Sequence, residues 1–429
     1  MPVSFGQTEI PSNQDVSFGT HPLLQMSFGN VIVWERIPQV NNSLMLTIEN
    51  PVDTLVLPLT QYNGQSYTVN WGDGTTNTNT NSHTYRDGYN RYYVVITGNC
   101  AWGNLHDTTK MFLEVSPTYQ RLVDSLVGMK VYGACPIRQF TKSTDVGAVG
   151  YVKTTGFAFC KKLKAYDTFL LNNLVLENDP TYTSVGGKMF KCYSLFYGAG
   201  IEKFNPAIFG NIASSNYITT YETDQFFTGC PMTFPDDESW GVNFRYNFSR
   251  NMRVFRAWEM FSSTNVVQHT YMFNGWNTYF QYLLEFDIFS MFFNCKNYTL
   301  ASSELFKYLP TSLERIRVGA FSNSGVKTIS EDILKHFPSS VKSHNFDSMF
   351  TATSITSIPS TMFTNTNIPN ASTTSLTSMF AYCDKITGAL PTIWNNYGKA
   401  LHLYTFNGCT NASNYSQVPD NWKNYYTSY

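Results

Sequence analysis

The residues best suited to chemistry are few, and their spacing builds no familiar active site. Asp73 and His83 could form an acid–base or metal pair, but no further ligand stands near them in the sequence. The acidic cluster Asp236–Glu238 follows Pro235 and is typical of a solvated turn, whereas a glycan depolymerase needs two carboxylates held across a cleft. Phosphate loops, His-Glu-x-x-His and Gly-x-Ser-x-Gly segments are absent. We therefore predict no catalytic, cofactor or metal residues and no enzyme.

The histidines and cysteines lead to the same expectation. The seven histidines are dispersed without ligand spacing. The eight cysteines show neither the short pairs of a zinc site nor the crowding of a disulfide scaffold. Because cysteine is among the most often buried residue types, we expect free, buried thiols.

Charge and hydropathy exclude several classes of partner. The chain has 29 Lys and Arg against 30 Asp and Glu, a formal net charge of -1, which offers no electrostatic footprint for nucleic acid or anionic lipid. No apolar run approaches a membrane span, and the first residues lack the basic and apolar parts of a signal peptide. Aromatic residues make up 16% and charged residues only 14%, which favours a protein that buries surface against neighbours. We expect a homo-oligomer, a dimer or trimer.

Residues 1–35 contain a small repeat. Its copies are Val3-Ser-Phe-Gly6, Val16-Ser-Phe-Gly19 and Met26-Ser-Phe-Gly29, and the last continues into Val31–Trp34. Each is a short β unit with too little area to be stable alone, so we predict a segment that attaches the chain to a larger particle. These units resemble the N-terminal segments of structural proteins of gut bacteriophages, including the crAss-like phages. The alternative is a β-hairpin that caps the next domain.

Residues 36–110 show the pattern of a small β-sandwich. Strands are expected at 44–48, 54–57, 67–71 and 92–96, where β-branched and aromatic residues alternate with polar ones. The order Val-Asn-Trp-Gly-Asp-Gly-Thr, polar loop, His-Thr-Tyr, strand resembles the PKD domain, an immunoglobulin-like sandwich of surface proteins. That resemblance implies a spacer or interaction module in which Asp73 and His83 tie a turn to a strand. Residues 111–150 are expected to be a connector.

Residues 151–429 contain a longer repeat whose anchor is a phenylalanine. From Phe196 onward the anchors are 31, 34, 31, 29, 29, 30 and 26 residues apart. Cysteine recurs three residues after the anchor, and apolar residues recur five, eight and thirteen residues after it. The anchors are Phe196, Phe227, Phe261, Phe292, Phe321, Phe350, Phe380 and Phe406.

The repeat predicts a solenoid. Alternation over the five residues that end at each anchor, such as 288–292, predicts one short strand per repeat, and 330–337 has helix-like spacing with Ser330 as its cap. One strand and one return segment cannot bury themselves, so neighbouring repeats must stack into a curved parallel-sheet solenoid. The Met-Phe-x-x-Cys and Ile-x-x-Ile-Pro pieces are similar to BspA-type leucine-rich repeats of bacterial surface proteins, although aromatics replace many leucines.

The sequence thus predicts a multidomain, mainly β chain with an attachment segment, a PKD-like sandwich and a leucine-rich-repeat-like solenoid. The function expected is that of a virion structural protein, a head fibre or tail fibre assembled in the host cytoplasm, which contacts other virion proteins and adheres to surface or mucus glycans. A bacterial cell-surface adhesin of the BspA-like type and a phage glycan depolymerase are the alternatives. Aromatic side chains on the solenoid face are the candidate glycan contacts: Trp258, Trp276, Tyr279, Trp394 and Tyr404.

Overall fold

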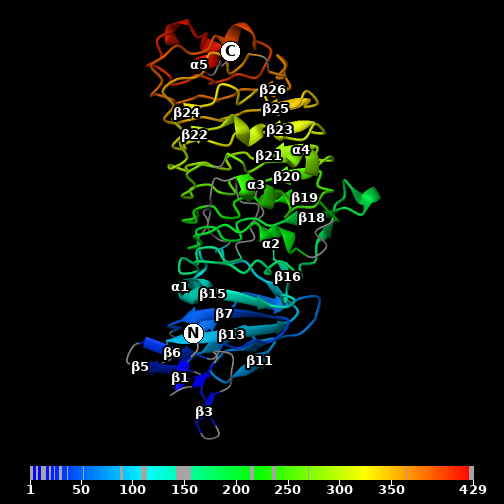
Figure 1. The fold of residues 1–429 in the computed structure, drawn as a ribbon, viewed down its shortest axis with the longest axis vertical. Coiled ribbons are helices and arrows are strands. Elements are labelled where there is room, and N and C mark those ends of the chain that lie inside the picture. The colour runs from blue at the N-terminus through cyan, green and yellow to red at the C-terminus, as the bar shows by residue number, and fades with distance from the viewer. Residues whose placement is uncertain are drawn as a thin grey trace.

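The fold is mainly β. The computed structural model describes residues 37–51, 53–86, 90–107, 114–141, 156–212, 217–233, 238–268, 270–364 and 366–424, with six short strands within residues 3–35. Its dominant feature is a β-solenoid of about six turns over residues 188–375. Figure 1 shows these turns stacked along the longest axis, with the N-terminal sheets at one end and the C-terminus at the other. The predicted mainly β fold and its solenoid are confirmed.

The first strands form three antiparallel pairs. Each Ser-Phe-Gly unit supplies the first strand of a pair, so the short β units expected here are hairpins. The attachment role of this segment stays a prediction. The pairs are β1 (Val3–Phe5) with β2 (Thr8–Ile10), β3 (Val16–Phe18) with β4 (His21–Leu23), and β5 (Gln25–Phe28) with β6 (Val31–Glu35).

Three sheets follow. The largest is a five-stranded antiparallel sheet with the order β11-β10-β13-β7-β15. A two-stranded sheet pairs β12 with β8, and a three-stranded sheet has the order β16-β14-β9. The four strands expected from the sequence are β7, β8, β10 and β13. The bounds are β7 (Ser43–Glu49), β8 (Thr54–Val56), β9 (Leu59–Gln61), β10 (Tyr67–Asn70), β11 (Thr76–Thr78), β12 (Ser82–Thr84), β13 (Arg91–Gly98), β14 (Cys100–Trp102), β15 (Leu126–Tyr132) and β16 (Ile137–Phe140).

The expected connector contributes to these sheets. After η1 (Pro117–Tyr119) and α1 (Gln120–Ser125), β15 pairs antiparallel with β7, and β16 runs parallel to β14. The boundary drawn at residue 110 therefore leaves out two strands, because their partners lie far away in the sequence. The sandwich and its PKD likeness stay predictions.

The solenoid is built on one eight-stranded sheet. Its order is β17-β18-β19-β20-β21-β23-β25-β26, parallel throughout except for the β17 edge. A second, two-stranded parallel sheet pairs β22 with β24. The strands are β17 (Glu177–Asn178), β18 (Lys188–Lys191), β19 (Ile218–Glu222), β20 (Val254–Arg256), β21 (Glu285–Asp287), β22 (Leu300–Ala301), β23 (Arg315–Arg317), β24 (Thr328–Ile329), β25 (Ser343–Asn345) and β26 (Thr374–Ser375).

Helices are short and lie in the return segments. The expected helix at 330–337 is wrong, because that segment forms consecutive turns in which the Ile333 N–H bonds to the Ser330 carbonyl at 3.1 Å. The α-helices are α2 (Ala207–Gly210), α3 (Glu238–Arg245), α4 (Trp276–Tyr279) and α5 (Asp420–Lys423). The 3₁₀ turns are η2 (Thr183–Val185), η4 (Ser303–Phe306), η5 (Ile393–Asn395) and η6 (Tyr415–Gln417).

The strand position within the repeat also differs from the prediction. The strand of the fourth repeat is β21, which ends at Asp287, so the predicted strand at 288–292 is wrong. Those residues form turns because Ser290 has φ 54°, in the left-handed region. The same conformation recurs two residues after the anchor, at Asn294 with φ 58°. Left-handed turns on both sides of the anchor thus replace the strand that the sequence pattern predicted.

The anchors stack into a continuous column, which we call the phenylalanine ladder. Neighbouring rings lie 5.5–6.3 Å apart and 4–20° from parallel, within the range of favourable aromatic stacking. The ladder begins one repeat before the predicted anchors, at Phe157, and Trp422 covers its far end at 6.2 Å from Phe406. Its members are Phe157, Phe196, Phe227, Phe261, Phe292, Phe321, Phe350, Phe380 and Phe406.

Backbone hydrogen bonds connect the turns beside the ladder. The Phe292 N–H donates to the Ala320 carbonyl at 2.9 Å, and the Ser290 N–H to the Gly319 carbonyl at 2.7 Å. The recurrent cysteine adds a third link, since the Cys295 thiol lies 3.1 Å from the carbonyl oxygen of Phe261, one repeat earlier. Cys230, Cys383 and Cys409 repeat that contact at 3.0–3.1 Å. All eight cysteines are buried, as expected, and each is a free thiol.

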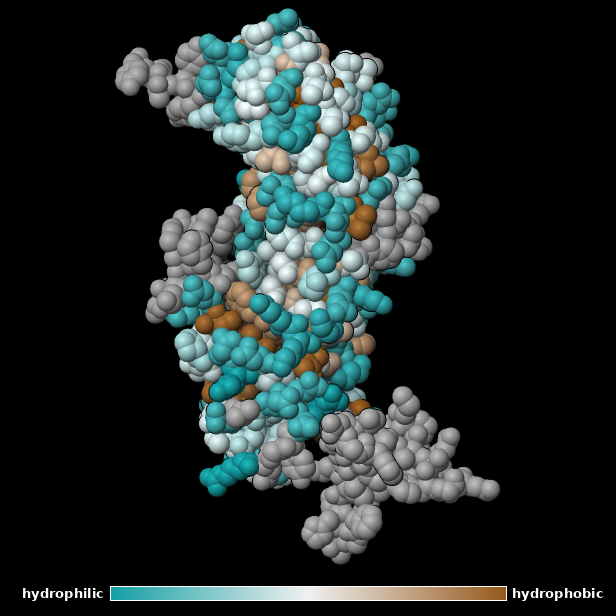
Figure 2. All heavy atoms as spheres, turned by 90° about the vertical axis from the view of Figure 1, so that its left-hand side faces the viewer, coloured by the Kyte–Doolittle hydropathy of each residue, from teal (hydrophilic) through white to brown (hydrophobic). Residues whose placement is uncertain are grey.

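The surface mixes polar and apolar residues. On the face drawn in Figure 2, the apolar residues of the described part lie in small groups between hydrophilic ones. Obligate oligomers usually bury broader apolar areas. This face therefore lacks the character of an obligate interface over the residues described.

Candidate functional site

The structure does not bring three of the five predicted glycan contacts, Trp276, Trp394 and Tyr404, into one surface site. Trp276 is fully buried and packs against Phe255, Phe273 and Phe280, so it belongs to the core. Trp394 is half-buried and meets Phe406 edge to face at 6.0 Å. Tyr404, also half-buried, occupies the left-handed position two residues before that anchor. Aromatic content predicted these positions but not which way each ring faces.

Trp258 lies beside a row of charged residues that follows the ends of the strands. Its ring is covered by the guanidinium groups of Arg256, at 3.7 Å, and Arg317, at 4.8 Å. Strand register places oppositely charged residues side by side in successive turns. We call this set the strand-end row: Lys191, Glu222, Arg256, Asp287 and Arg317.

Ion pairs within the strand-end row and with the neighbouring Asp224 neutralise several of its charges. Lys191 lies 3.3 Å from Glu222, and Arg256 lies 3.4 Å from the carboxylate of Asp224. Burial raises the pKa of Asp224 to about 7, although Arg256 and the Trp258 backbone N–H lower it in part. Burial likewise raises the pKa of Asp287 to about 6. Because these carboxylates and arginines are buried against each other, the row is better suited to holding turns in register than to binding a ligand.

Tyr279, the remaining predicted contact, borders a surface depression of about 240 Å³. The other lining residues are Arg250, Thr278, Gln281 and Tyr282. Tyr282 is 49% exposed, and Arg250, Thr278 and Gln281 are exposed as well. The depression therefore combines two phenol rings with a guanidinium, an amide and a hydroxyl. Pockets for drug-sized ligands start near 300 Å³, so this one suits a single ring-sized group.

The turn that begins α4 fixes this arrangement. Gly275 has φ 71°, and a β-carbon there would lie 1.4 Å from Nη1 of Arg245. Glycine thus lets the Arg245 side chain cross the turn and donate to the Asn274 carbonyl at 3.1 Å. Arg245 also donates to the Tyr246 hydroxyl at 3.1 Å, and the Tyr246 ring meets Tyr279 edge to face at 5.2 Å.

Three arginines stack on three tyrosines around the depression. Arg245 lies 4.8 Å from the ring centre of Tyr246, Arg250 lies 4.8 Å from that of Tyr279, and Arg253 lies 4.6 Å from that of Tyr282. These distances place each guanidinium over a ring face. We call these six residues the arginine–tyrosine patch.

The backbone of the patch is anchored in the sheet. The Arg253 N–H donates to the Thr219 carbonyl at 2.7 Å, and its own carbonyl accepts from Leu284 and Glu285. Met252, its neighbour in sequence, is fully buried. These contacts fix the backbone of Arg253, which lies directly before β20.

The patch is cationic. The hydrogen bond from Arg245, followed by its positive charge, lowers the pKa of the Tyr246 phenol. Over the described residues, none of the three arginines is ion-paired with a carboxylate. The sequence does contain a signal for this cationic patch, because there are four arginines and no acidic residue between Glu238 and Glu259. A search for aromatic residues alone does not detect it.

The Asp73 and His83 side chains do meet. His83 Nε2 lies 2.6 Å from Asp73 Oδ2, and the Asp73 carboxylate also accepts from the Thr75 N–H and hydroxyl. Burial alone would raise the pKa of Asp73, but the hydrogen bonds from Thr75 and His83 hold it below its ordinary value. His83 stacks on Trp71 at 5.1 Å. This contact ties the turn to β12, as expected for a structural pair.

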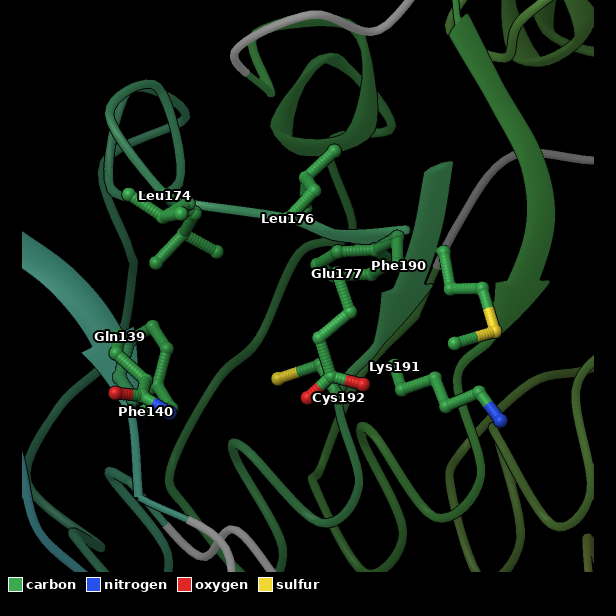
Figure 3. Close-up of a pocket in the computed structure, with 10 residues that line it drawn as sticks. Gln139, Phe140, Leu174, Leu176, Glu177, Phe190, Lys191 and Cys192 are labelled. Carbon is green, nitrogen blue, oxygen red and sulfur yellow. The ribbon is translucent and has the colours of Figure 1, made fainter. Parts of the chain in front are cut away.

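A second cavity is too small for a ligand site. A cavity of about 70 Å³ lies at the joint between β16 and β18 (Figure 3), lined among others by Phe140, Leu174, Glu177 and Lys191. It has room for only one or two waters. Asp236 and Asp237 of the acidic cluster lie outside the described residues.

Comparisons identify no relative. No protein-family model, curated protein or solved structure matches the chain. Within the described residues, His, Cys, Asp and Glu side chains form no cluster of three or more that could hold a metal ion. The described helices include none long and apolar enough to cross a membrane. The fold and the patch together define a β-solenoid protein with a cationic, aromatic surface depression.

Proposed function

We propose that the chain is a structural protein of a bacteriophage particle, a head fibre or tail fibre that adheres to glycans of the host surface or of mucus. The depression beside Tyr279 carries the adhesive part of this proposal. Its two tyrosine rings offer flat apolar faces for a sugar ring, and Arg250, Gln281 and Thr278 offer hydrogen-bonding groups around them. An orientation fixed by a few polar groups around aromatic faces is the common pattern of small-ligand sites.

The architecture supports the fibre. A solenoid extends by stacking and offers one long lateral surface, which suits a projecting appendage. The glycine-ended units of residues 1–35 resemble the N-terminal segments of gut-phage structural proteins, and the motif order of residues 36–110 resembles that of a PKD spacer. The solenoid repeats are similar to BspA-type leucine-rich repeats. In this proposal residues 1–35 bind other virion proteins, and copies of the chain assemble as a dimer or trimer in the host cytoplasm.

Binding to host polysaccharide tests the adhesive part. Tyr282→Ala removes a half-exposed ring of the depression, and Tyr382→Ala removes a 62% exposed ring in another repeat as the matched control. With the protein immobilised and purified host capsular polysaccharide as the probe, we expect Tyr282→Ala to weaken binding about tenfold or more, equal to about 1.4 kcal/mol. Tyr382→Ala should bind like the unmodified protein. Equal loss in both variants would contradict a site at the depression.

Two further readouts separate the alternative functions. Mass spectrometry of purified virions should detect the chain, whereas its presence only in the bacterial envelope would favour a cell-surface adhesin. The molecular mass of the polysaccharide should stay constant during incubation with the protein. A falling mass would identify a depolymerase instead.

A further inference from the structure

We propose that the ligand of the arginine–tyrosine patch is an acidic polysaccharide, whose sugar ring packs on Tyr279 and Tyr282 while its carboxylate or sulfate binds Arg250. This inference rests on the glycan adhesion proposed above and adds the class of glycan. It starts from a contrast between this patch and the other arginines of the solenoid.

Of the other three arginines of the solenoid, two have acidic partners, and Arg317 lies over the rings of Phe289 and Trp258. Arg315 donates to Glu285 at 2.6 Å, and Arg256 lies 3.4 Å from Asp224. Arg245, Arg250 and Arg253 form no ion pair with any described carboxylate. Three positive charges thus gather within nine residues of a chain whose formal net charge is -1. Such an excess attracts an anion.

Two acidic groups close to the start of β20 are already engaged. Glu285 is bound to Arg315, and Asp179 accepts from the hydroxyls of Thr219 and Thr220 at 2.8 and 2.7 Å. These carboxylates are therefore held by other partners rather than by the patch. An incoming anion would be the acidic partner that the patch arginines lack.

The stacked geometry leaves the donors of Arg250, which is exposed and lines the depression, available to a ligand. A guanidinium lying on a phenol ring uses its face for the ring and keeps its N–H groups in its own plane, where they match the two oxygens of a carboxylate or sulfate. The Nη groups of Arg245 already donate to the Asn274 carbonyl and the Tyr246 hydroxyl at 3.1 Å, so the exposed Arg250 supplies the accessible donors. The same tyrosines that orient the arginines can also pack against the sugar.

The volume of the depression limits the size of the ligand that it can bind. A volume of about 240 Å³ holds one sugar ring with its substituent, not an oligosaccharide. Affinity for a polymer must then come from many copies of the acidic unit meeting several copies of the chain on one particle. A single site should accordingly bind weakly.

The test compares polymers that differ only in charge. The protein is immobilised and exposed, at a fixed ionic strength of about 150 mM, to polygalacturonate, to the same polymer after reduction of its carboxyl groups, to dextran sulfate and to dextran. We expect at least about tenfold tighter binding of the acidic member of each pair. The pair with the larger ratio identifies carboxylate or sulfate as the preferred group.

Variants assign the effect to the patch. Arg250→Gln should reduce binding of the acidic polymer about tenfold or more, and Arg250→Lys should restore only part of it because lysine lacks the planar fork. Arg121→Gln, a change in an exposed arginine that lies 3.2 Å from Asp53, is the matched control and should bind normally.

Each contrary result has a distinct meaning. Equal binding of the acidic and neutral polymers overturns the acidic class and leaves glycan adhesion standing. Equal loss in Arg250→Gln and Arg121→Gln, or equal binding of duplex DNA, shows a general response to polyanions and overturns the inference. Failure of every polymer to bind, including host polysaccharide, overturns glycan adhesion together with it.

Discussion

Replacing His344 with phenylalanine should stabilise the solenoid, and the gain should grow as the pH falls. His344 is the middle residue of β25 and is fully buried, and neither ring nitrogen has a hydrogen-bond partner in the described structure. The register carries this position back through the parallel sheet to a run of aromatic residues. They are Phe190, Tyr221, Phe255 and Phe286, followed by Ile316. A phenyl ring therefore matches the chemistry of this position.

Two costs should disappear. At neutral pH an unpaired buried polar group costs about 1–3 kcal/mol. In acid, burial lowers the pKa of His344 from 6.5 to about 4, so the unfolded chain takes up the proton first. Stability is thus lost as the pH falls from about 6.5 to about 4. At about 1.4 kcal/mol per pH unit, this loss reaches about 3 kcal/mol.

Thermal unfolding at pH 7.5 and at pH 4.5 measures both terms. For a domain of this size about 1 kcal/mol shifts Tm by about 2–4 °C, so His344→Phe should raise Tm by several degrees at pH 7.5 and by more at pH 4.5. Tyr382→Phe changes an exposed ring and should behave like the unmodified protein at both pH values. Two results would refute the reasoning. One is a lower Tm for His344→Phe than for the unmodified protein at pH 7.5, and the other is an equal loss of Tm between pH 7.5 and pH 4.5 in these two proteins.

Three other predictions concern the ladder, the strand-end row and the thiols. Phe321→Ala interrupts the phenylalanine ladder and should cost about 3–5 kcal/mol in thermal or urea unfolding, whereas Tyr382→Ala should stay within about 0.5 kcal/mol; similar values for the two would show that the stack adds little. The raised pKa of Asp224 in the folded protein makes its ionisation destabilising, so stability should fall by about 1.4 kcal/mol per pH unit as the pH rises from about 4 to 7. Asp224→Asn should remove this fall, and an unchanged dependence of stability on pH would contradict the prediction. Burial raises the pKa of Cys100 to about 12 and that of Cys383 to about 11, so a thiol reagent at pH 8 should detect no cysteine in the folded protein and all eight after denaturation, and rapid reaction of several native thiols would count against the buried positions.

The repeat was predictable because its anchor is a packing position. One phenylalanine in each turn is needed for rings such as Phe292 and Phe321 to stack at 5.9 Å, so the recurrence of phenylalanine in the sequence reflects contact between turns. The position of the strand was not predictable in the same way. Left-handed residues such as Ser290 and Asn294 are uncommon outside glycine, so the sequence pattern does not reveal that turns take the place of a strand here.

The candidate site was predicted only at Tyr279. Nothing in the sequence decides that Trp276, three residues earlier, turns into the core, because both rings are equally suited to either environment. The arginines were missed because their proposed role depends on the lack of an ion pair with any described carboxylate and on the tyrosines that they meet in space. A linear pattern displays neither feature. Only their acid-free run from 245 to 256 is visible beforehand.

The ladder also separates two kinds of evolutionary change. Ring spacing stays within 5.5–6.3 Å although the chain between anchors varies from 26 to 39 residues, so added or deleted residues are taken up by the loops and leave the axial rise almost constant. The segment that bears Arg245 to Arg253 lies within the 34-residue interval between Phe227 and Phe261. A lineage could therefore exchange such loops, and with them the surface that they present, while keeping the same solenoid length and the same stacking of its turns.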